Sequence, residues 1–265
     1  MKGRKTKGSS VIAAIDVGTN SVHMVVARIG EHGFHVLSAE KEVVRLGSGA
    51  AGMDFLTPEA IERAVTALGR MKQIADAHEA DIKAVATSAV REATNAKEFL
   101  QRAKKEVGIS VEVISGNEEA RLIHLGVQHS LAFGTESVLT VDIGGGSTEF
   151  CVSTKGRLRI AQSVKVGAVR LTDAFLSNGD PDEPSIRRLR AHVSSVIAPL
   201  AHEIRELGFS RAVLSSGTSE TIARLVANER GGRLPQSMNG FSFTKGDLLR
   251  FTYSSFSHSV LVLCK

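Results

Sequence analysis

The sequence predicts an α/β protein of two related lobes with a cleft between them. The main observation is an internal repeat: Ile15-Asp16-Val17-Gly18 returns 126 residues later as Val141-Asp142-Ile143-Gly144, and Ser21 corresponds to Ser147. Each copy opens its own series of three strands followed by helices, which indicates duplication. We therefore expect each lobe to present one Asp-Gly hairpin to the cleft.

The first lobe begins with three strands and then alternates helices and strands. β-Branched apolar runs separated by Gly and Asn predict the strands, and apolar residues at helical spacing predict the helices. The expected strands are Val11–Asp16, Val22–Ile29, Phe34–Arg45, Ile82–Thr87 and Val111–Ile114. The expected helices are Pro58–Ala75, Asn95–Val107 with Gly108 ending it, and Asn117–Gln128 with Asn117 as its N-cap.

The second lobe repeats this order. Its expected strands are Val138–Asp142, Glu149–Ser153, Leu158–Val166 and Ala212–Ser215, and its expected helices are Ala168–Leu176, Pro184–Leu207 and Thr218–Ala227. The predicted division is a basic flexible tail at 1–10, a first lobe at 11–128 and a second lobe at 129–265. Because the signals weaken after about residue 228, the second lobe is expected to be incomplete or divergent there. In the alternative, Lys245–Phe251 and Val260–Cys264 supply the remaining elements.

Composition narrows the class of protein. The net charge is +5, but Lys2, Arg4, Lys5 and Lys7 contribute four positive charges to a tail without acids, which leaves 29 − 28 = +1 for the rest. With one tyrosine and no tryptophan, the chain offers no basic–aromatic strip for nucleic acid. No apolar run approaches the ~20 residues of a membrane span, and the two distant cysteines suit a reducing compartment. We expect a cytoplasmic protein with no specific nucleic-acid or membrane partner.

The most informative stretch runs from Asp142 to Glu149. Three glycines after a strand, Gly144, Gly145 and Gly146, allow a tight turn whose N–H groups bind phosphate oxygens, and Ser147 adds a hydroxyl. The flanking carboxylates of Asp142 and Glu149 would reach one hard cation such as Mg²⁺ across the hairpin. A plain glycine hairpin with two solvent-facing acids is the alternative.

Other polar groups follow predicted strands. The first hairpin offers Asp16, Gly18, Thr19, Asn20 and Ser21 for the far side of the same phosphate, or as ordinary turn residues. Arg91 follows a strand and could hold a phosphate, and Gly217 and Thr218 open a helix whose N-terminus could hold an anion. Glu118 and Glu119 begin another helix, where either carboxylate could accept a proton from an attacking water.

These motifs resemble the exopolyphosphatase and guanosine pentaphosphate phosphohydrolase (Ppx/GppA) family. The resemblance covers residues 11–227 and rests on Ala14–Ser21, Thr87–Ala93, Ile114–Arg121, Val141–Glu149 and Ser216-Gly217-Thr218, in the order and spacing of the family. The family belongs to the actin-like superfamily, so the resemblance implies two actin-like (ribonuclease-H-like) lobes. The second lobe of this chain is expected to depart from that pattern and to be incomplete or divergent after about residue 228. It also implies Glu119 as catalytic base, Asp142 and Glu149 as ligands of Mg²⁺ or Mn²⁺, and the hairpins with Arg91 as the phosphate shell.

The implied reaction is hydrolysis of a terminal phosphate from polyphosphate or guanosine pentaphosphate, and the implied assembly is a homodimer. Two alternatives are an actin-like kinase or ATPase, and a non-catalytic polyphosphate or nucleotide binder. The residues after about Arg250 depart from the family pattern, and no His-Asp dipeptide of the family's helical domain occurs.

Overall fold

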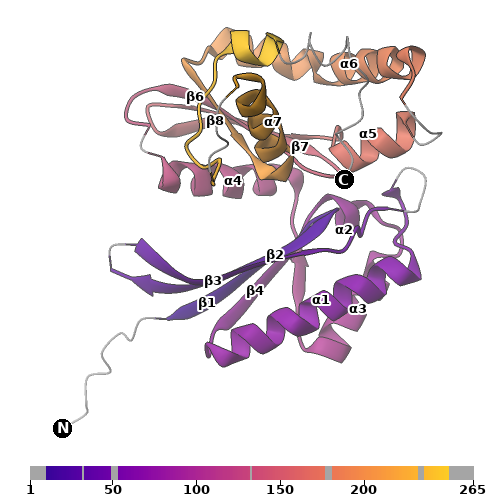
Figure 1. The fold of residues 1–265 in the computed structure, drawn as a ribbon. Helices are drawn as coiled ribbons and strands as arrows, with labels where there is room; N and C mark the ends of the chain where they lie inside the picture. Colours follow the sequence, from indigo (N-terminus) through magenta and orange to yellow (C-terminus); the bar gives the residue numbers. More distant parts are fainter. Residues whose placement is uncertain are drawn as a thin grey trace. The chain divides into compact units, whose positions relative to one another are not determined.

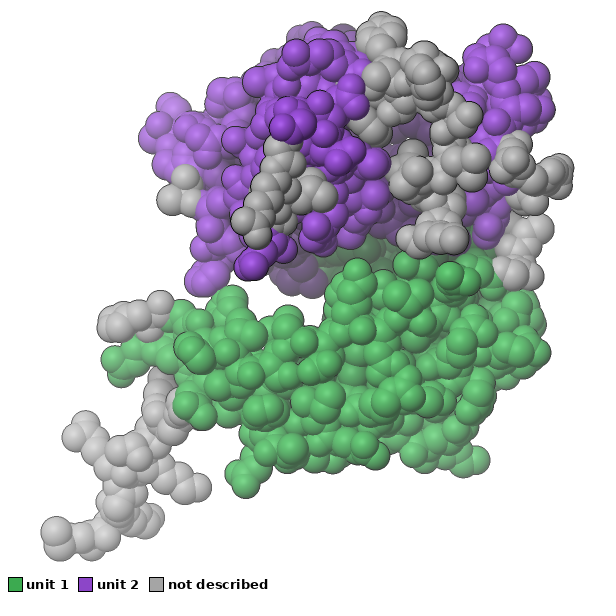
Figure 2. All heavy atoms as spheres, in the orientation of Figure 1, with its two compact units in different colours: residues 1–119 green, residues 120–265 purple. Residues whose placement is uncertain are grey.

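The computed structural model describes residues 10–31, 33–48, 53–131, 133–176, 181–231 and 236–250. The chain divides into two compact units, unit 1 at residues 1–119 and unit 2 at residues 120–265 (Figure 2). Both this division and the boundary at Gln128 expected from the sequence fall inside one helix, α4, Gly116–Ser130. Residues 1–9 of the expected basic tail and the segment Val260–Cys264 lie outside the described residues.

Unit 1 is a five-stranded mixed sheet with helices on one face (Figure 1). The strand order is β3-β2-β1-β4-β5, in which β1–β2 and β2–β3 are antiparallel and β1–β4 and β4–β5 are parallel. The strands are β1 Val11–Val17, β2 Ser21–Gly30, β3 Gly33–Val43, β4 Asp81–Ala86 and β5 Val111–Val113. All five predicted strands are confirmed.

The core of unit 1 lies between the sheet and α1, Pro58–Ala77. Thr57 caps this helix, since its hydroxyl accepts a hydrogen bond from the Ala60 N–H, and Pro58 occupies the first turn. The buried stripe of α1 recurs at helical spacing, as predicted, and packs on alternate residues of β1 and β2. That alternation leaves Ala14 and Asp16 of β1 on the opposite face.

Three helical details differ from the sequence prediction. A five-residue helix, α2 Ser88–Glu92, was not predicted. The predicted helix at 95–107 is α3, Ala96–Arg102, followed by a π-helical turn, η2 Ala103–Val107, and ends as predicted at Gly108, whose φ is +80°. The N-cap of α4 is Ser115, not Asn117, because the Ser115 hydroxyl accepts from the Glu118 N–H and the helix begins at Gly116.

Unit 2 repeats the first four strands of this plan. Its sheet has the order β8-β7-β6-β9, with strands β6 Ser137–Ile143, β7 Thr148–Thr154, β8 Arg157–Val164 and β9 Arg211–Ser215. The repeat includes an irregularity of register: one bulge lies at Val26/Ala27 and the other at Val152/Ser153, again 126 residues apart. The duplication inferred from the sequence is thus confirmed in the backbone.

Unit 2 contains the three helices predicted for it. They are α5 Ala168–Phe175, α6 Glu183–Leu207 and α7 Ser216–Glu229. Of these, α6 and α7 pack on the sheet. Leu200 and Ile204 of α6 pack on Val152 and Ile160. Beyond α7, Met238 joins Ala223 and Ala227 of that helix in a small apolar cluster, against which Phe241 and Phe243 pack. In the described part of the chain, no helix is both long and apolar enough to span a membrane.

Candidate active site

The two Asp-Gly hairpins have the same turn geometry. The Gly18 N–H donates to the Ser21 carbonyl at 3.0 Å, and the Gly144 N–H donates to the Ser147 carbonyl at 3.0 Å. A Cβ on either glycine would stand 3.0 Å from that carbonyl oxygen, which is tighter than ordinary contact, so glycine suits both positions. Each unit therefore carries one pre-shaped turn at the end of its first strand.

The hairpin of unit 1 is tied to the segment that follows β3. The N–H groups of Val44 and Arg45 both donate to the Asn20 carbonyl, at 2.9 and 2.8 Å, and the Gly47 N–H donates to the Thr19 carbonyl at 2.9 Å. Thr19 is buried, and the predicted phosphate residues Gly18 to Ser21 thus form one anchored turn. Asp16 lies on the exposed face of β1, just before this turn.

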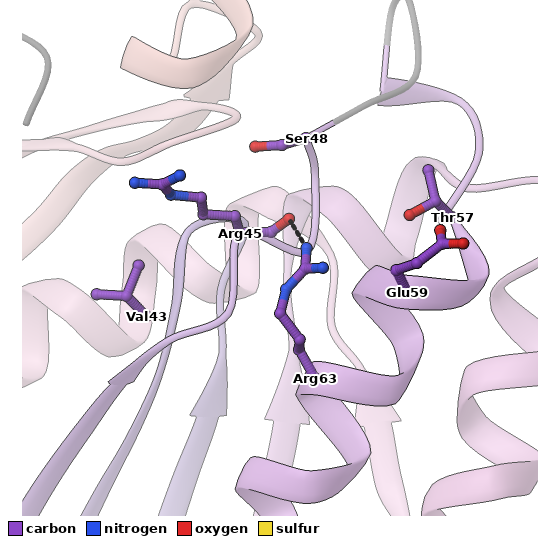
Figure 3. A pocket seen from close by; sticks show the side chains of 6 residues that line it. All are labelled: Val43, Arg45, Ser48, Thr57, Glu59 and Arg63. Carbon is purple, nitrogen blue, oxygen red and sulfur yellow. Dashed lines mark hydrogen bonds between the residues drawn. The ribbon is translucent and has the colours of Figure 1, made fainter.

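A hollow of about 720 Å³ opens beside this segment (Figure 3). Arg63 is fixed there, because its Nε donates to the Val44 carbonyl at 2.8 Å. Arg45 has a left-handed φ of +48°, and its side chain extends away from Arg63. An exposed guanidinium beside the hairpin is a candidate anion-binding group that sequence analysis missed, since the pattern around Arg45 indicates only the end of a strand. Val43, Ser48, Thr57 and Glu59 complete the lining.

Unit 1 also joins two residues predicted to act in catalysis. Arg91 Nη1 donates to Glu119 Oε2 at 3.0 Å and to the Ile114 carbonyl at 3.0 Å. Both side chains are largely buried, with exposed fractions of 22% and 15%. Arg91 comes from the short helix α2, while Glu119 lies in the first turn of α4. The predicted phosphate-binding arginine is therefore a direct partner of the predicted base.

In unit 2 the start of α5 holds the glycine loop. The Ala168 N–H donates to the Gly144 carbonyl at 2.9 Å, and the Val169 and Arg170 N–H groups donate to the Gly145 carbonyl at 2.9 and 3.1 Å. Arg170 Nε also donates to the Gly146 carbonyl at 2.8 Å. Because these three carbonyls are engaged by α5, the loop is fixed on that side. The predicted residues Gly144 to Ser147 thus form one turn, with Ser147 buried.

The two predicted metal ligands face each other across that hairpin. Asp142 on β6 and Glu149 on β7 are directly opposed in the antiparallel register. Glu149 is buried and accepts a hydrogen bond from the Ser163 hydroxyl at 2.7 Å. Asp142 accepts one from the Ser215 hydroxyl. Burial raises the pKa of Asp142, and the Ser215 hydrogen bond opposes that rise.

The buried thiol of Cys151 lies on the same face of β7, two residues beyond Glu149. It donates to the Ala120 carbonyl at 3.0 Å. Burial, and then the negative charges of Glu149 and Asp142, raise its pKa to about 12. A thiol with that pKa stays protonated at neutral pH, so Cys151 is no nucleophile.

The predicted anion site at Gly217 and Thr218 forms the start of α7. Ser216, just before them, has a φ of +89°, a backbone conformation that residues other than glycine rarely adopt. Its hydroxyl donates to the Ile143 carbonyl at 2.8 Å, so this strained residue ties α7 to the end of β6. Gly217 and Thr218 therefore stand next to the carboxyl ends of β6 and β9.

Comparison with known proteins supplies the context for these hairpins. A model of the Ppx/GppA phosphatase family matches residues 25–250. A crystal structure of an exopolyphosphatase from Cytophaga hutchinsonii is similar, with a TM-score of 0.85, 32% identity, and coverage of 94% of this chain and 81% of that one. A Ppx-GppA enzyme from Aquifex aeolicus is similar too, with a TM-score of 0.75, 29% identity, and coverage of 94% and 82%.

Proposed function

The chain belongs to the Ppx/GppA phosphatase family, and we propose that it hydrolyses the terminal phosphoanhydride bond of inorganic polyphosphate. Its likeness to an exopolyphosphatase over 94% of the chain supports a phosphoanhydride hydrolase. Polyphosphate is proposed as substrate because that structural relative is an exopolyphosphatase. Guanosine pentaphosphate ends in the same bond and is the substrate to compare with it.

The glycine hairpin of unit 2, with its opposed carboxylates, is the observation that carries this proposal. The turn is fixed through its carbonyls by α5, which suits it to offer N–H groups to a phosphate. Asp142 and Glu149 stand side by side at the base of the same turn. A phosphate-binding turn beside two hard oxygen ligands is the donor set that phosphoryl transfer requires.

The residues present fit a divalent cation of the magnesium type. Mg²⁺ is usually held by one or two carboxylates, several waters and the phosphate of the substrate. Among the described residues, no cluster of three or more His, Cys, Asp or Glu side chains forms a closed metal cage, and two opposed carboxylates match the open arrangement. Asp142 and Glu149 would hold the ion, which would neutralise charge on the transferred phosphoryl group. Mn²⁺ would suit the same ligands.

Glu119 is proposed as the general base. Water attacks the terminal phosphorus, a new P–O bond forms, and the bond to the bridging oxygen breaks. The water proton passes to the Glu119 carboxylate, and the bridging oxygen leaves with a chain one phosphate shorter. Arg91 orients one oxygen of Glu119 for this transfer. Each hairpin, taken by itself, carries turn N–H groups and a hydroxyl, that of Thr19 or of Ser147, which suit it to bind phosphoryl oxygens.

The test is phosphate release by the purified full chain with Mg²⁺. We expect release from polyphosphate, and loss of that release in a Glu119→Gln variant. Guanosine pentaphosphate in a parallel assay measures the preference between the two substrates. Phosphate transfer from ATP to an acceptor, without release to water, would instead establish a kinase. Binding of polyphosphate, with no turnover of any of these substrates, would establish a non-catalytic binder.

A further inference from the structure

Four polar residues stand in one row across the sheet of unit 2. Ser163 on β8 is opposite Glu149 on β7, Glu149 is opposite Asp142 on β6, and Asp142 is opposite Ser215 on β9. Residues directly opposite on neighbouring strands carry their side chains on the same face of the sheet. We call these four residues the serine–carboxylate row.

Each outer serine donates to the carboxylate beside it. The Ser163 hydroxyl donates to Glu149 Oε1 at 2.7 Å, and the Ser215 hydroxyl donates to Asp142 Oδ2. Glu149 is only 2% exposed, and burying a carboxylate is costly unless hydrogen bonds compensate for the lost water. The serines supply that compensation, and each one fixes an oxygen of its carboxylate and restricts the rotation of that group.

The position of Ser163 depends on the bulge in the β7–β8 ladder. Ser153 pairs with Leu158, but Val152 pairs with Ile160, so one extra residue enters β8. Without it, Gln162 would stand opposite Glu149. In the structure Gln162 instead contacts Glu203 of α6, at 3.4 Å. β-Bulges often re-aim side chains next to active sites, and this one places a hydroxyl beside a buried carboxylate.

We propose that Ser163 and Ser215 are positioning residues that hold Glu149 and Asp142 in the orientation that binds the divalent cation. This inference rests on the proposed function, which makes the two carboxylates the metal ligands. Hydrogen bonds to ligating carboxylates fix the direction of their lone pairs, and loss of such a partner typically weakens metal binding about 10–100-fold. The serines lie on the two outer strands of the row, so each acts on one carboxylate.

The experiment measures Mn²⁺ binding to the metal-free full chain by electron paramagnetic resonance, without substrate or turnover. We expect Ser163→Ala and Ser215→Ala each to raise the Kd for Mn²⁺ by about 10–100-fold. Ser163→Thr, which keeps a hydroxyl, should stay within a few-fold of wild type. Ser137→Ala is the matched control, because Ser137 donates to Thr154 at the far end of the β6–β7 hairpin. It should bind Mn²⁺ like wild type.

Thermal unfolding in chelator shows whether each variant is folded, and the two alanine variants on separate strands provide independent tests. Unchanged Mn²⁺ affinity in folded Ser163→Ala and Ser215→Ala, together with weakened affinity in Asp142→Asn, would overturn the positioning role and leave the metal site standing. Unchanged affinity in Asp142→Asn as well would overturn the metal assignment of the proposed function. A loss of Mn²⁺ affinity in Ser137→Ala as large as the loss in Ser163→Ala and Ser215→Ala would also overturn the inference.

Discussion

Arg91 and Glu119, 28 residues apart in the chain, are joined by a hydrogen bond of 3.0 Å between Nη1 and Oε2. The same Nη1 donates to the Ile114 carbonyl, the last residue before the loop that leads into α4. The guanidinium thus connects α2 to the end of β5 and to the first turn of α4. A carboxylate held in this way keeps one orientation, as a general base requires.

We expect Glu119→Gln to lower kcat by about 10²–10⁴, the usual contribution of a positioned general base. The amide keeps the size of the side chain but cannot accept the water proton, so the KM for polyphosphate should change little. Steady-state phosphate release measures both constants. Glu118→Gln is the neighbouring control and should retain activity. Loss of activity in the Glu118 variant alone would move the base to that residue.

Arg91→Lys should lower kcat/KM by roughly 10–100-fold, since a hydrogen bond to a charged group contributes about 1.5–3 kcal/mol. Lysine replaces the rigid, planar guanidinium with an ammonium on a flexible stem, which is not held at the position from which Arg91 Nη1 donates to both Glu119 and the Ile114 carbonyl. Arg102→Lys is the control, because Arg102 forms ion pairs with Glu62 and Glu106 on the surface of unit 1. Equal losses in both variants would show a general effect of charge on the fold.

Asp142→Asn should raise the Mg²⁺ concentration required for activity and stabilise the metal-free protein at pH 7. Burial raises the pKa of Asp142 above its ordinary value of 3.8, so the folded state binds this proton more tightly than the unfolded state. The protonated Asp142 side chain therefore contributes stability to the folded state. This contribution is fully present below about pH 3.8 and is lost as pH rises through the folded pKa. Thermal unfolding in chelator should give Asp142→Asn a higher melting temperature than wild type at pH 7, and the difference between the two melting temperatures should be smaller near pH 4. A lower melting temperature for the variant at pH 7 would contradict this account.

Gly167→Ala should displace the glycine loop. A Cβ at residue 167 would stand 2.3 Å from the Gly145 carbonyl oxygen and 2.4 Å from the Gly146 carbonyl carbon, both of them backbone atoms. Overpacking of this kind costs about 1–3 kcal/mol, and activity should fall with it. Gly126→Ala in α4 is the control, because its Cβ would meet nothing within 4 Å. That change should stabilise the helix by up to about 1 kcal/mol. Denaturant unfolding of both variants and of wild type measures these changes in the free energy of unfolding.

Local patterns were enough to predict the strands and both hairpins. Most of those strands contain an apolar run bounded by turn residues, and the repeat at 126 residues linked the two glycine turns. The helix α2 was missed because five residues are too few for a helical period to show. Ser163 was missed because its place opposite Glu149 depends on the bulge at Val152/Ser153. Sequence alternation counted from the Lys155–Gly156 turn would have aligned Gln162 there instead.

The partnership of Arg91 with Glu119 could not be predicted for a related reason. The sequence points to each residue separately, to Arg91 as a phosphate ligand and to Glu119 as a base. Their contact depends on how β4 and β5 pair, and a three-residue strand gives little register information. The tethering of the glycine loop by α5 likewise arises from a close backbone approach at Gly167, which its own sequence neighbourhood does not reveal.

The last prediction concerns the segment after α7, where the sequence favoured an incomplete or divergent lobe. Residues 245–250 are helical, in agreement with the alternative that Lys245–Phe251 supplies an element, although Phe251 itself lies outside the described residues. Asp247 accepts hydrogen bonds from the Thr244 N–H at 2.8 Å and the Thr244 hydroxyl at 2.6 Å, and it pairs with Arg230 and Arg250. The Asp247 N–H donates in turn to the Thr244 hydroxyl at 3.2 Å. Thr244 and Asp247 thus form a reciprocal cap at the start of the helical turn, and Asp247 ties that turn to Arg230 at the end of α7.

Asp247→Asn should therefore loosen residues 236–250 and leave unit 1 unchanged. These hydrogen bonds, above all the one from Arg230, hold the pKa of Asp247 well below its ordinary value of 3.8. A lowered folded pKa means stability that is present above pH 3.8 and is lost as pH falls below it. Hydrogen exchange should show lower protection at 236–250, relative to the intrinsic exchange rate at each pH, in Asp247→Asn at pH 7 and in the wild type as pH drops below about 4. Asp76→Asn, on the exposed i,i+4 pair with Lys72 in α1, is the control. Unchanged protection of 236–250 in the Asp247 variant would show that the apolar cluster around Met238 holds the segment by itself.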